Sequence, residues 1–302
     1  MHFKNLVLSG AQIKGLSYIG VGKAMNELNL MNFENILGVS SGAIFAFTLA
    51  VNLDINDIEN LVLGINKEHL MDINLDNILQ FTESYGFDSG KKFEKIFKIL
   101  CNKILGDENA TFEDLKRKKN SKNLIICGSN ISLKKQEFFC YKTTPNMPIW
   151  IALRISISIP IYFNKVCYNG YCYCDGGITN NLPIFYFDNF EETLGIIITD
   201  PSTYKNNNNL SFQNYLYRII DCMVGQYQRQ IKEKYKENII EIFIIYDIFK
   251  LKFDNAVKNE IILNGYKQFK QKYYKIKDKK IEKIILELLD DLKNRLILLN
   301  NE

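Results

Sequence analysis

Residues 38–42 read Gly-Val-Ser-Ser-Gly, and this stretch is the most informative part of the 302-residue chain. The apolar run Asn35–Val39 predicts a buried strand that leads into it, and the nearly all-apolar run Ala43–Val51 predicts a buried helix that leaves it. A chain that passes from strand to helix at one residue must turn sharply, and the two glycines allow the backbone to approach its neighbours closely. The stretch therefore predicts a strand–turn–helix unit with Ser40 at its apex.

A similar unit precedes it at the start of the chain. The run Phe3–Leu8 predicts a buried strand, Ser9-Gly10 closes it, and Leu16–Leu28 then has the apolar spacing of a helix. Two successive units of this kind are typical of parallel sheets whose faces are covered by helices. We therefore predict an α/β protein with three layers, α/β/α, around a mainly parallel central sheet.

The rest of the chain continues this alternation. We predict further strands at residues 122–127, 136–141, 194–199 and 239–246, a hairpin of 165–168 and 171–173 around Asn169-Gly170, and helices at 55–79, 90–104, 149–158, 210–236 and from 254 to the end. The chain has no internal repeat and no linker rich in Pro, Gly or Ser. We expect one domain over residues 1–302, with its core at about 4–275 and a C-terminal helix at 276–302.

The composition, 47% hydrophobic and 24% charged, is that of a globular protein. The longest apolar stretches, such as Ile149–Leu153 and Leu194–Ile198, are far shorter than the ~18 residues of a membrane span. Ser9 and Gln12 interrupt the apolar start of the chain before a secretory signal could form. We expect a location in the cytoplasm or at the periphery of intracellular membranes. The seven cysteines lack zinc-site or disulfide spacing, which predicts buried free thiols and no metal site.

The net charge of +4 is concentrated near the C-terminus, where residues 250–302 carry 13 basic and 8 acidic side chains. The chain has no zinc-finger, RNA-binding or basic-zipper signature, so we expect no nucleic acid partner. The lysine-rich segment Gly265–Lys283 has two interpretations: a solvated helix face, which we favour, and a surface that contacts an anionic membrane. The apolar stripe within Ile281–Leu299 is expected to pack on the body of the protein rather than on lipid or a partner.

Ser40 also has two interpretations, a nucleophile or a residue that merely caps the following helix. A nucleophilic serine needs a base, and the usual partner is histidine. This chain has only His2, at its terminus, and His69, in a polar helix end. An α/β-hydrolase places its histidine after the acid, near the C-terminus, so a Ser-His-Asp triad is not expected. A hydrolase that uses His69 remains an alternative.

Asp175 supplies a base of another type. It ends the apolar, aromatic run Tyr171–Cys174 and is followed by Gly176 and Gly177, which allow a sharp turn and leave space beside the carboxylate. A free aspartate has a pKa near ~3.9, too low for an efficient base, but partial burial raises it. The alternative is an ordinary Asp-Gly turn without a catalytic role.

A third glycine-containing turn follows the first predicted strand. Backbone N–H groups of such a strand–loop–helix segment can hold an anion. The loop is not a nucleotide-binding loop, because Leu16 stands where a lysine is required, and it is not a dinucleotide fingerprint, because Gln12 stands where a glycine belongs. We therefore predict an oxyanion hole beside Ser40, formed by the N–H groups of Gly10, Ala11 and Gln12.

Together these motifs resemble those of the patatin-like phospholipase family. That family combines an oxyanion loop G-G-G-x-[RK]-G, an elbow G-x-S-x-G and an acid in D-G-[GA]. Further similarities lie at residues 152–160, 181–183 and 265–266, so the resemblance covers about residues 4–275. The matching positions are Lys14 and Gly15 of the loop, Gly38, Ser40 and Gly42 of the elbow, and Asp175, Gly176 and Gly177 of the acid motif.

The resemblance implies a lipid acyl hydrolase of the phospholipase A type, with a Ser40–Asp175 dyad, phospholipid as substrate and no cofactor. Ala11 and Gln12 depart from the family pattern, since they stand where it has glycine. Conformations that favour glycine would be costly at these positions, and we expect the loop to have settled in an ordinary conformation. The alternative is a catalytically weak relative that binds lipid without turnover.

Overall fold

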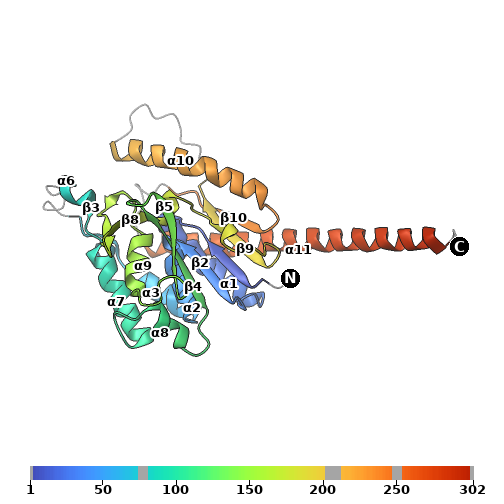
Figure 1. The fold of residues 1–302 in the computed structure, drawn as a ribbon, viewed down its shortest axis with the longest axis horizontal. Helices are drawn as coiled ribbons and strands as arrows, with labels where there is room; N and C mark the ends of the chain where they lie inside the picture. Colours follow the sequence, from blue (N-terminus) through green and yellow to red (C-terminus); the bar gives the residue numbers. More distant parts are fainter. Residues whose placement is uncertain (1–2, 74–80, 201–211, 247–253, 300–302) are drawn as a thin grey trace.

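The computed structural model describes residues 3–73, 81–200, 212–246 and 254–299. A central sheet lies between helices on both of its faces, and the long C-terminal helix projects from the body (Figure 1). This arrangement confirms the predicted three layers, α/β/α.

The main sheet is mixed but mostly parallel. Its strands lie side by side in the order β10 (Ile239–Phe243), β9 (Thr193–Thr199), β1 (Asn5–Leu8), β2 (Asn35–Val39), β4 (Asn123–Asn130), β8 (Tyr171–Asp175) and β7 (Val166–Tyr168), and β5 (Lys135–Cys140) also pairs with β4. Neighbouring strands from β10 to β4 are parallel, whereas β5, β8 and β7 pair in antiparallel fashion. Two short strands, β3 (Gly86–Asp88) and β6 (Ile161–Phe163), pair with each other apart from this sheet.

Helices form most of the connections between the strands. They are α1 (Ser17–Glu27), α2 (Ser41–Ala50), α3 (Ile55–Gly64), α4 (Lys67–Leu70), α6 (Phe81–Ser84), α7 (Lys91–Leu105), α8 (Phe112–Arg117), α9 (Ile149–Ser156), α10 (Phe212–Lys234) and α11 (Asn255–Leu299), with short 3₁₀ helices η1 (Gln12–Leu16), η2 (Gly176–Ile178) and η3 (Ile184–Tyr186). Both early strand–turn–helix units predicted from the sequence are present, from β1 to α1 and from β2 to α2.

The two faces of the sheet bury different sets of side chains. Leu6 and Leu8 of β1 are fully buried in a cluster with side chains of α1, α2, α9 and α11, whereas Val7 is buried in a separate cluster with side chains of α10 and η3. Alternate residues of a strand point to opposite faces, so a strand that is covered on both faces is apolar throughout. This explains why residues 6–8 of β1 are all apolar.

β4 has three partner strands on its two edges. β5 pairs with Ile125–Asn130 along one edge, so the other partners must share the opposite edge. On that edge, β2 pairs with Asn123–Cys127 in parallel and β8 pairs with Gly128–Asn130 in antiparallel fashion. The C-terminal ends of β2 and β8 therefore meet head to head beside Cys127 and Gly128, and this brings together the residues at which the two strands end.

The predicted helix over residues 55–79 is broken in the structure. α3 ends at Gly64, the short α4 follows, and residues 74–80 lie outside the described part of the chain. The buried side chain of Lys258, from α11, donates to Val62 O at 3.1 Å, and Ile65 is extended. Because a distant lysine satisfies the carbonyl groups at the end of α3, the helix ends there, which local periodicity could not reveal.

The described side chains of the apolar stripe, at residues 281–289, do not pack on the body, which corrects the prediction for this part of the stripe. α11 lies against α1 with its first half, where Ile261 and Phe269 are fully buried, and then continues away from the body (Figure 1). Beyond the body, six apolar side chains are 45–58% exposed: Ile281, Ile284, Ile285, Leu286, Leu288 and Leu289. None of the helices described is both long and apolar enough to cross a membrane.

α1 and α11 cross at two glycines. A side chain at Gly20 would overlap the backbone oxygen of Ile262, and one at Gly265 would overlap the backbone oxygen of Ser17. The two helices therefore approach each other backbone to backbone, closer than larger residues would allow. This contact anchors α11 to the body of the protein.

We expect Gly265→Ala to destabilise the protein by about 1–3 kcal/mol, because the added methyl group must push α11 away from α1. Gly225→Ala in α10 is the matched control, since a Cβ there meets only Arg229 Nη1, at 3.8 Å. The control should be neutral or stabilising, by up to about 1 kcal/mol. Urea denaturation followed by circular dichroism measures both, and equal effects of the two substitutions would contradict the close crossing.

Candidate active site

Ser40 stands at the turn between β2 and α2, as predicted. Its backbone has φ = 52° and ψ = −125°, in a region that is costly for a residue other than glycine. The turn is held by a hydrogen bond from Ser40 N–H to Ser156 Oγ at 2.8 Å. Ser156 in turn donates to Cys127 O at 2.7 Å, so α9 ties the turn after β2 to the middle of β4.

The side chain of Ser40 does not cap α2. Ser40 precedes the helix, yet its hydroxyl accepts no hydrogen bond from the first helical turn. The interpretation of Ser40 as a simple helix cap is therefore wrong. Packing explains the glycine at position 42, because a Cβ there would lie 2.5 Å from Leu8 O. Glycine thus lets α2 begin directly against the end of β1.

Asp175 ends β8 and lies opposite Gly128, next to the end of β2. Its backbone is fixed by a hydrogen bond from Asp175 N–H to Ser158 O at 2.9 Å and by one from Ser129 Oγ to Asp175 O at 2.8 Å. In the carboxylate, Oδ1 accepts from Gly177 N–H at 2.7 Å, whereas Oδ2 is buried without a hydrogen-bond partner among the described residues. One oxygen is thus held in place and the other can accept a proton.

The environment of Asp175 raises its pKa. Only 4% of the residue is exposed, and this burial raises the pKa of Asp175 to about 7, because a charged carboxylate is poorly solvated there. The neighbouring Ser40 hydroxyl and the Gly177 N–H favour the charged form and lower the pKa, but they do not offset the burial. A carboxylate whose pKa is near neutrality is a better proton acceptor than an ordinary aspartate.

The loop after β1 lies directly against Ser40. A Cβ at Gly10 would come within 2.8 Å of Ser40 Cβ, so a larger residue would displace the serine. The side-chain amide of Asn181 holds Gly10 by two hydrogen bonds, one from Gly10 N–H to Asn181 Oδ1 at 2.9 Å and one from Asn181 Nδ2 to Gly10 O at 3.0 Å. Asn181 follows the Asp175 turn, so it joins the loop to the segment that carries the acid.

A second set of contacts holds the next residues of the loop. Ala11 N–H donates to Ser41 Oγ at 3.0 Å, and Gly15 lies so close to that hydroxyl that a Cβ would be 2.5 Å from it. Lys14, the basic residue of the motif, forms an ion pair with Asp200 at 2.9 Å, just beyond the end of β9. The loop is therefore fixed to the elements on either side of it.

Gln12 corrects the expectation that the loop adopts an ordinary conformation. Its φ is 52°, in the left-handed region that favours glycine, and it stands where the patatin-like motif has glycine. Ala11, with φ = −153°, is not strained. The loop thus keeps a backbone suited to glycine although that glycine is missing, at a cost of roughly 1–2 kcal/mol.

The three predicted oxyanion donors differ in their hydrogen bonds. The N–H groups of Gly10 and Ala11 already donate to side chains, whereas Gln12 N–H has no acceptor among the described residues. Ser41 N–H, in the first turn of α2, likewise has no acceptor within the described ranges. Ser41 N–H is therefore available to an anion at the positive end of a helix, which the motif alone did not indicate.

Three polar residues of the site were not identified as site residues from the sequence: Asn181, Ser41 and Ser156. Each of them hydrogen-bonds a backbone group of the two turns that meet here. Ser156 had a detectable signal, because it lies in a helix whose only other polar side chain is Arg154, and a buried hydroxyl there needs a partner. Asn181 lies in the stretch 181–183 that resembles the family, but nothing in that stretch indicates its bond to Gly10, which is 171 positions away.

The histidines give no support to a histidine base. His69 lies on α4 and is exposed, and its Nδ1 accepts a hydrogen bond from Asn66 N–H at 3.1 Å. Ser40, by contrast, is buried, with 5% exposure. His69 thus stabilises a local turn, and His2 lies outside the described residues.

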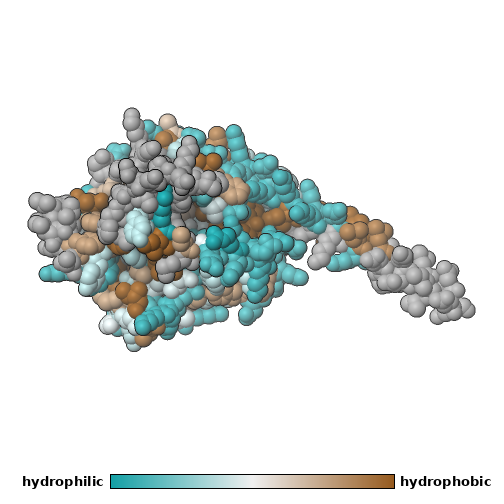
Figure 2. All heavy atoms as spheres, turned by 90° about the horizontal axis from the view of Figure 1, so that it is seen from above, coloured by the Kyte–Doolittle hydropathy of each residue, from teal (hydrophilic) through white to brown (hydrophobic). Residues whose placement is uncertain are grey.

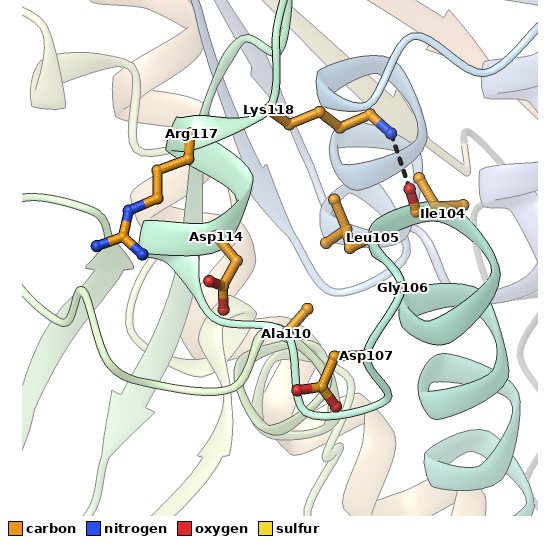
Figure 3. Close-up of a pocket in the computed structure, with 8 residues that line it drawn as sticks. All are labelled: Ile104, Leu105, Gly106, Asp107, Ala110, Asp114, Arg117 and Lys118. Carbon is orange, nitrogen blue, oxygen red and sulfur yellow. Dashed lines mark hydrogen bonds between the residues drawn. The ribbon is translucent and has the colours of Figure 1, made fainter.

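A pocket of about 390 Å³ lies elsewhere, between the end of α7 and α8 (Figure 3). Two of its charged side chains already serve the helix ends: Asp114 forms a capping box with Thr111, and Lys118 donates to Ile104 O at 2.7 Å. The other lining residues are Leu105, Gly106, Asp107, Ala110 and Arg117. None of these residues belongs to the cluster around Ser40, so we do not assign the pocket to catalysis.

Known sequences resemble this chain over most of its length. Residues 6–188, more than half of the chain, match the family model described as patatin-like phospholipase. An uncharacterized protein of Acanthamoeba polyphaga mimivirus is 30% identical over 287 residues, which cover 90% of this chain and 94% of the viral protein. A probable lipid hydrolase of Invertebrate iridescent virus 6 is 30% identical over 252 residues, which cover 82% of this chain and 79% of that protein.

A solved structure has a similar fold. VipD from Legionella pneumophila matches with a TM-score of 0.57 and 20% sequence identity. The match covers 90% of this chain and 66% of VipD, so the chain spans slightly less than two thirds of that protein. At this identity the likeness supports the fold alone.

The strained loop predicts the effect of Gln12→Gly. Removal of the side chain should relieve the left-handed backbone and raise the free energy of unfolding by about 1 kcal/mol. If the same strain also opposes the transition state, kcat for a soluble acyl ester should rise by up to about tenfold with little change in KM. Urea denaturation and steady-state kinetics measure the two effects.

Lys134→Gly is the matched control, because Lys134 also has a left-handed φ, of 54°, but lies in the turn between β4 and β5. It should stabilise the protein similarly and leave kcat unchanged. A Gln12→Gly variant that is less stable than the wild type would show that the loop is not strained.

Proposed function

The chain belongs to the patatin-like phospholipase family, and we propose that it is a lipid acyl hydrolase that cleaves fatty acyl esters of phospholipids. The family and a relative named as a probable lipid hydrolase support the substrate class. The observation that carries the proposal is a strained serine next to a buried carboxylate, Ser40 and Asp175, where the ends of β2 and β8 meet. A serine hydrolase without a nearby histidine needs a base of this kind.

In this proposal Ser40 is the nucleophile and Asp175 its general base. Oδ2 of the charged Asp175, which has no other hydrogen-bond partner in the described structure, takes the hydroxyl proton as Ser40 Oγ attacks the ester carbonyl. Oδ1 stays bound to Gly177 N–H, which keeps the carboxylate oriented during the transfer. The proton then passes to the leaving oxygen, a lysophospholipid departs, and the fatty acyl group remains on Ser40 as an ester.

The charge that develops on the carbonyl oxygen needs N–H donors. We assign this role to the loop after β1, with Gln12 N–H as the donor that is not yet engaged, together with Ser41 N–H at the start of α2. The N–H groups of Gly10 and Ala11 hold the loop in place, and they join the oxyanion hole if substrate displaces their side-chain acceptors.

Release of the acyl group repeats the same chemistry with water. Asp175 takes a proton from a water molecule as this water attacks the acyl ester of Ser40. The serine oxygen then leaves and receives that proton, so a free fatty acid and the starting enzyme result. Proton transfer by one carboxylate and stabilisation by backbone N–H groups account for both steps.

The conformation of Gln12 favours a second candidate, a relative that binds lipid with little turnover. Because Gln12 is strained, the loop conformation whose N–H groups must hold the oxyanion is less stable. The positioned and desolvated carboxylate argues for the active enzyme, because burial of Asp175 destabilises the fold and is explained by a catalytic role. Turnover of a chromogenic acyl ester separates the two candidates.

We further propose that the exposed part of α11 contacts an anionic membrane. Its apolar side chains, such as Ile284 and Leu288, are 55% and 58% exposed, and Figure 2 shows apolar surface on the projecting helix. The segment Gly265–Lys283 carries eight lysines and two acids, a charge that complements anionic lipid. A helix of this kind lies in the membrane surface, with its apolar side chains among the lipid headgroups and acyl chains.

Ser40→Ala should lower ester turnover by at least about a thousandfold, because nucleophilic attack is lost rather than substrate binding. Asp175→Asn is nearly isosteric and should cost about as much, since the two residues act as a unit. Steady-state kinetics on a chromogenic acyl ester measure both effects. A fluorophosphonate probe should label the wild type but not Ser40→Ala.

The control for the dyad replaces both histidines, as His2→Ala with His69→Ala, and should keep most of the activity. A folded double variant without activity would refute the dyad, and so would an active Ser40→Ala variant. Mass analysis of a phospholipid mixture tests the substrate class: the wild type should release fatty acid and lysophospholipid, and Ser40→Ala should release neither.

The raised pKa of Asp175 predicts the pH dependence of catalysis. Asp175 must be charged to accept a proton, and its pKa is about 7. Below that value kcat/KM should rise about tenfold per pH unit, and above it kcat/KM should level off. Kinetics on a soluble ester between about pH 5 and pH 9 measure the profile. A flat profile over this range would contradict a base of raised pKa.

The same shift predicts a stability effect. The protonated Asp175 stabilises the folded protein relative to the charged form. This contribution is fully present below the pKa of ~3.9 in the unfolded chain, and it is lost as the pH rises through the pKa of the folded protein. Asp175→Asn is neutral at every pH, so at about pH 8 it should be more stable than the wild type by up to about 4 kcal/mol. Urea denaturation should show the difference shrinking toward about pH 4.

The exposed stripe of α11 predicts vesicle binding. The wild type should co-sediment with vesicles that contain phosphatidylserine, less so at high salt, and weakly with phosphatidylcholine alone. Ile284→Ser combined with Leu288→Ser should weaken binding about tenfold or more and leave turnover of a soluble ester unchanged.

Leu263→Ser is the matched control for vesicle binding, because Leu263 is 49% exposed on the part of α11 that lies along the body. It should bind vesicles like the wild type. A double variant that binds as well as the wild type would refute the membrane contact. Sedimentation data would also refute it if they showed that the wild type forms a dimer through the stripe and does not bind vesicles.

A further inference from the structure

The hairpin of β7 and β8 leads directly to Asp175 and carries two cysteines. Its turn, Asn169-Gly170, has φ values of 48° and 81°, the primed turn that the sequence predicts. This turn sets a register in which Cys167 lies directly opposite Cys172. Residues directly opposite each other in an antiparallel pair point to the same face. The two thiols therefore lie side by side, close to the start of the strand that ends in the acid.

The backbone of Cys172 shows which kind of pair this is. Its N–H donates to Ser132 Oγ at 2.9 Å, and its C=O accepts from Ile131 N–H at 3.0 Å, so both groups point away from β7. Cys167 and Cys172 are thus a non-hydrogen-bonded pair, in which the Cα atoms are about 4.5 Å apart. A disulfide needs Cα atoms about 4.4–6.8 Å apart, so the bond can form with little movement of the strands.

The pair is also accessible. Cys167 is exposed and Cys172 is half-buried, whereas Cys174, further along β8, is buried. Together with the exposed Cys222 of α10, they correct the expectation that the cysteines are buried. The nearby Cys172 thiol raises the pKa of Cys167, while Lys165 lowers it in part, so the Cys172 thiol lies close to that of Cys167.

We propose that Cys167 and Cys172 form a reversible cross-strand disulfide when the protein meets an oxidised low-molecular-weight thiol such as glutathione disulfide. The Cys167 thiolate attacks glutathione disulfide, a mixed disulfide forms, and one glutathione leaves. The Cys172 thiolate then displaces the second glutathione. The two cysteines lose two protons and two electrons, and glutathione disulfide is reduced to two glutathione molecules.

The position of this bond gives it a structural consequence. β7 is the edge strand of the sheet, and in the reduced protein three residue pairs join it to β8. Edge strands open more readily than central strands. A disulfide between Cys167 and Cys172 links the edge covalently to the strand that ends in Asp175. The thiol pair is therefore a modification site that stiffens the support of the acid under oxidising conditions.

The test maps the bond in the full-length protein. The protein is incubated with glutathione disulfide, remaining thiols are blocked with iodoacetamide, and chymotryptic peptides are analysed by mass spectrometry. Cleavage after Tyr168, Tyr171 and Tyr173 separates the cysteines of the hairpin. We expect the peptides of Cys167 and Cys172 to be linked in most molecules and to separate again after reduction with dithiothreitol.

Cys222 is the matched control, because it is exposed but lies on α10, outside the hairpin, and it should carry a glutathione adduct. In Cys167→Ser the link should be absent, and Cys172 should carry an adduct or iodoacetamide. The proposal is overturned if Cys167 and Cys172 stay unlinked while Cys222 has reacted, or if either of them links to Cys174 instead.

Discussion

The shared edge of β4 is the constraint on which the rest of the site depends. β2 and β8 occupy this edge from opposite directions, and their C-terminal ends meet beside Cys127 and Gly128. Because two buried strands end at the same place inside the protein, Ser40 and Asp175 become neighbours that are almost completely hidden from water. Burial then raises the pKa of the acid, and this raised pKa suits the role of general base that we propose for Asp175.

This arrangement costs stability, and neighbouring side chains hold it in place. Ser40 and Gln12 both have left-handed backbones, and one oxygen of Asp175 is buried without a partner among the described residues. Strained or unsatisfied groups persist only where the surrounding contacts leave little alternative. Ser156 supplies such contacts to the turn at Ser40, and Asn181 supplies them to the loop beside it. Contacts from α9 and from the segment after the acid thus hold the strained residues of the proposed site.

The parts of the site that could be predicted from the sequence are those with a short, local pattern. Ser40 and Asp175 each end an apolar strand and are flanked by glycines, so their positions follow from a few residues. The bond between Asn181 and Gly10 joins residues 171 positions apart, and nothing near either residue indicates it. At Gln12 the sequence shows a residue type that disfavours the left-handed region, but the φ of 52° is imposed by contacts from distant segments. Likewise, the periodicity of α11 indicates an apolar face but not what covers it.

The central claim is that burial beside Ser40 raises the pKa of Asp175 to about 7. Infrared difference spectroscopy with isotope-labelled aspartate measures this pKa directly, and comparison with Asp175→Asn identifies the band. In a titration from about pH 4 to about pH 9, the carboxylic acid band of Asp175 should disappear with a midpoint of about 7. A midpoint near ~3.9, the value of an exposed aspartate, would contradict the claim.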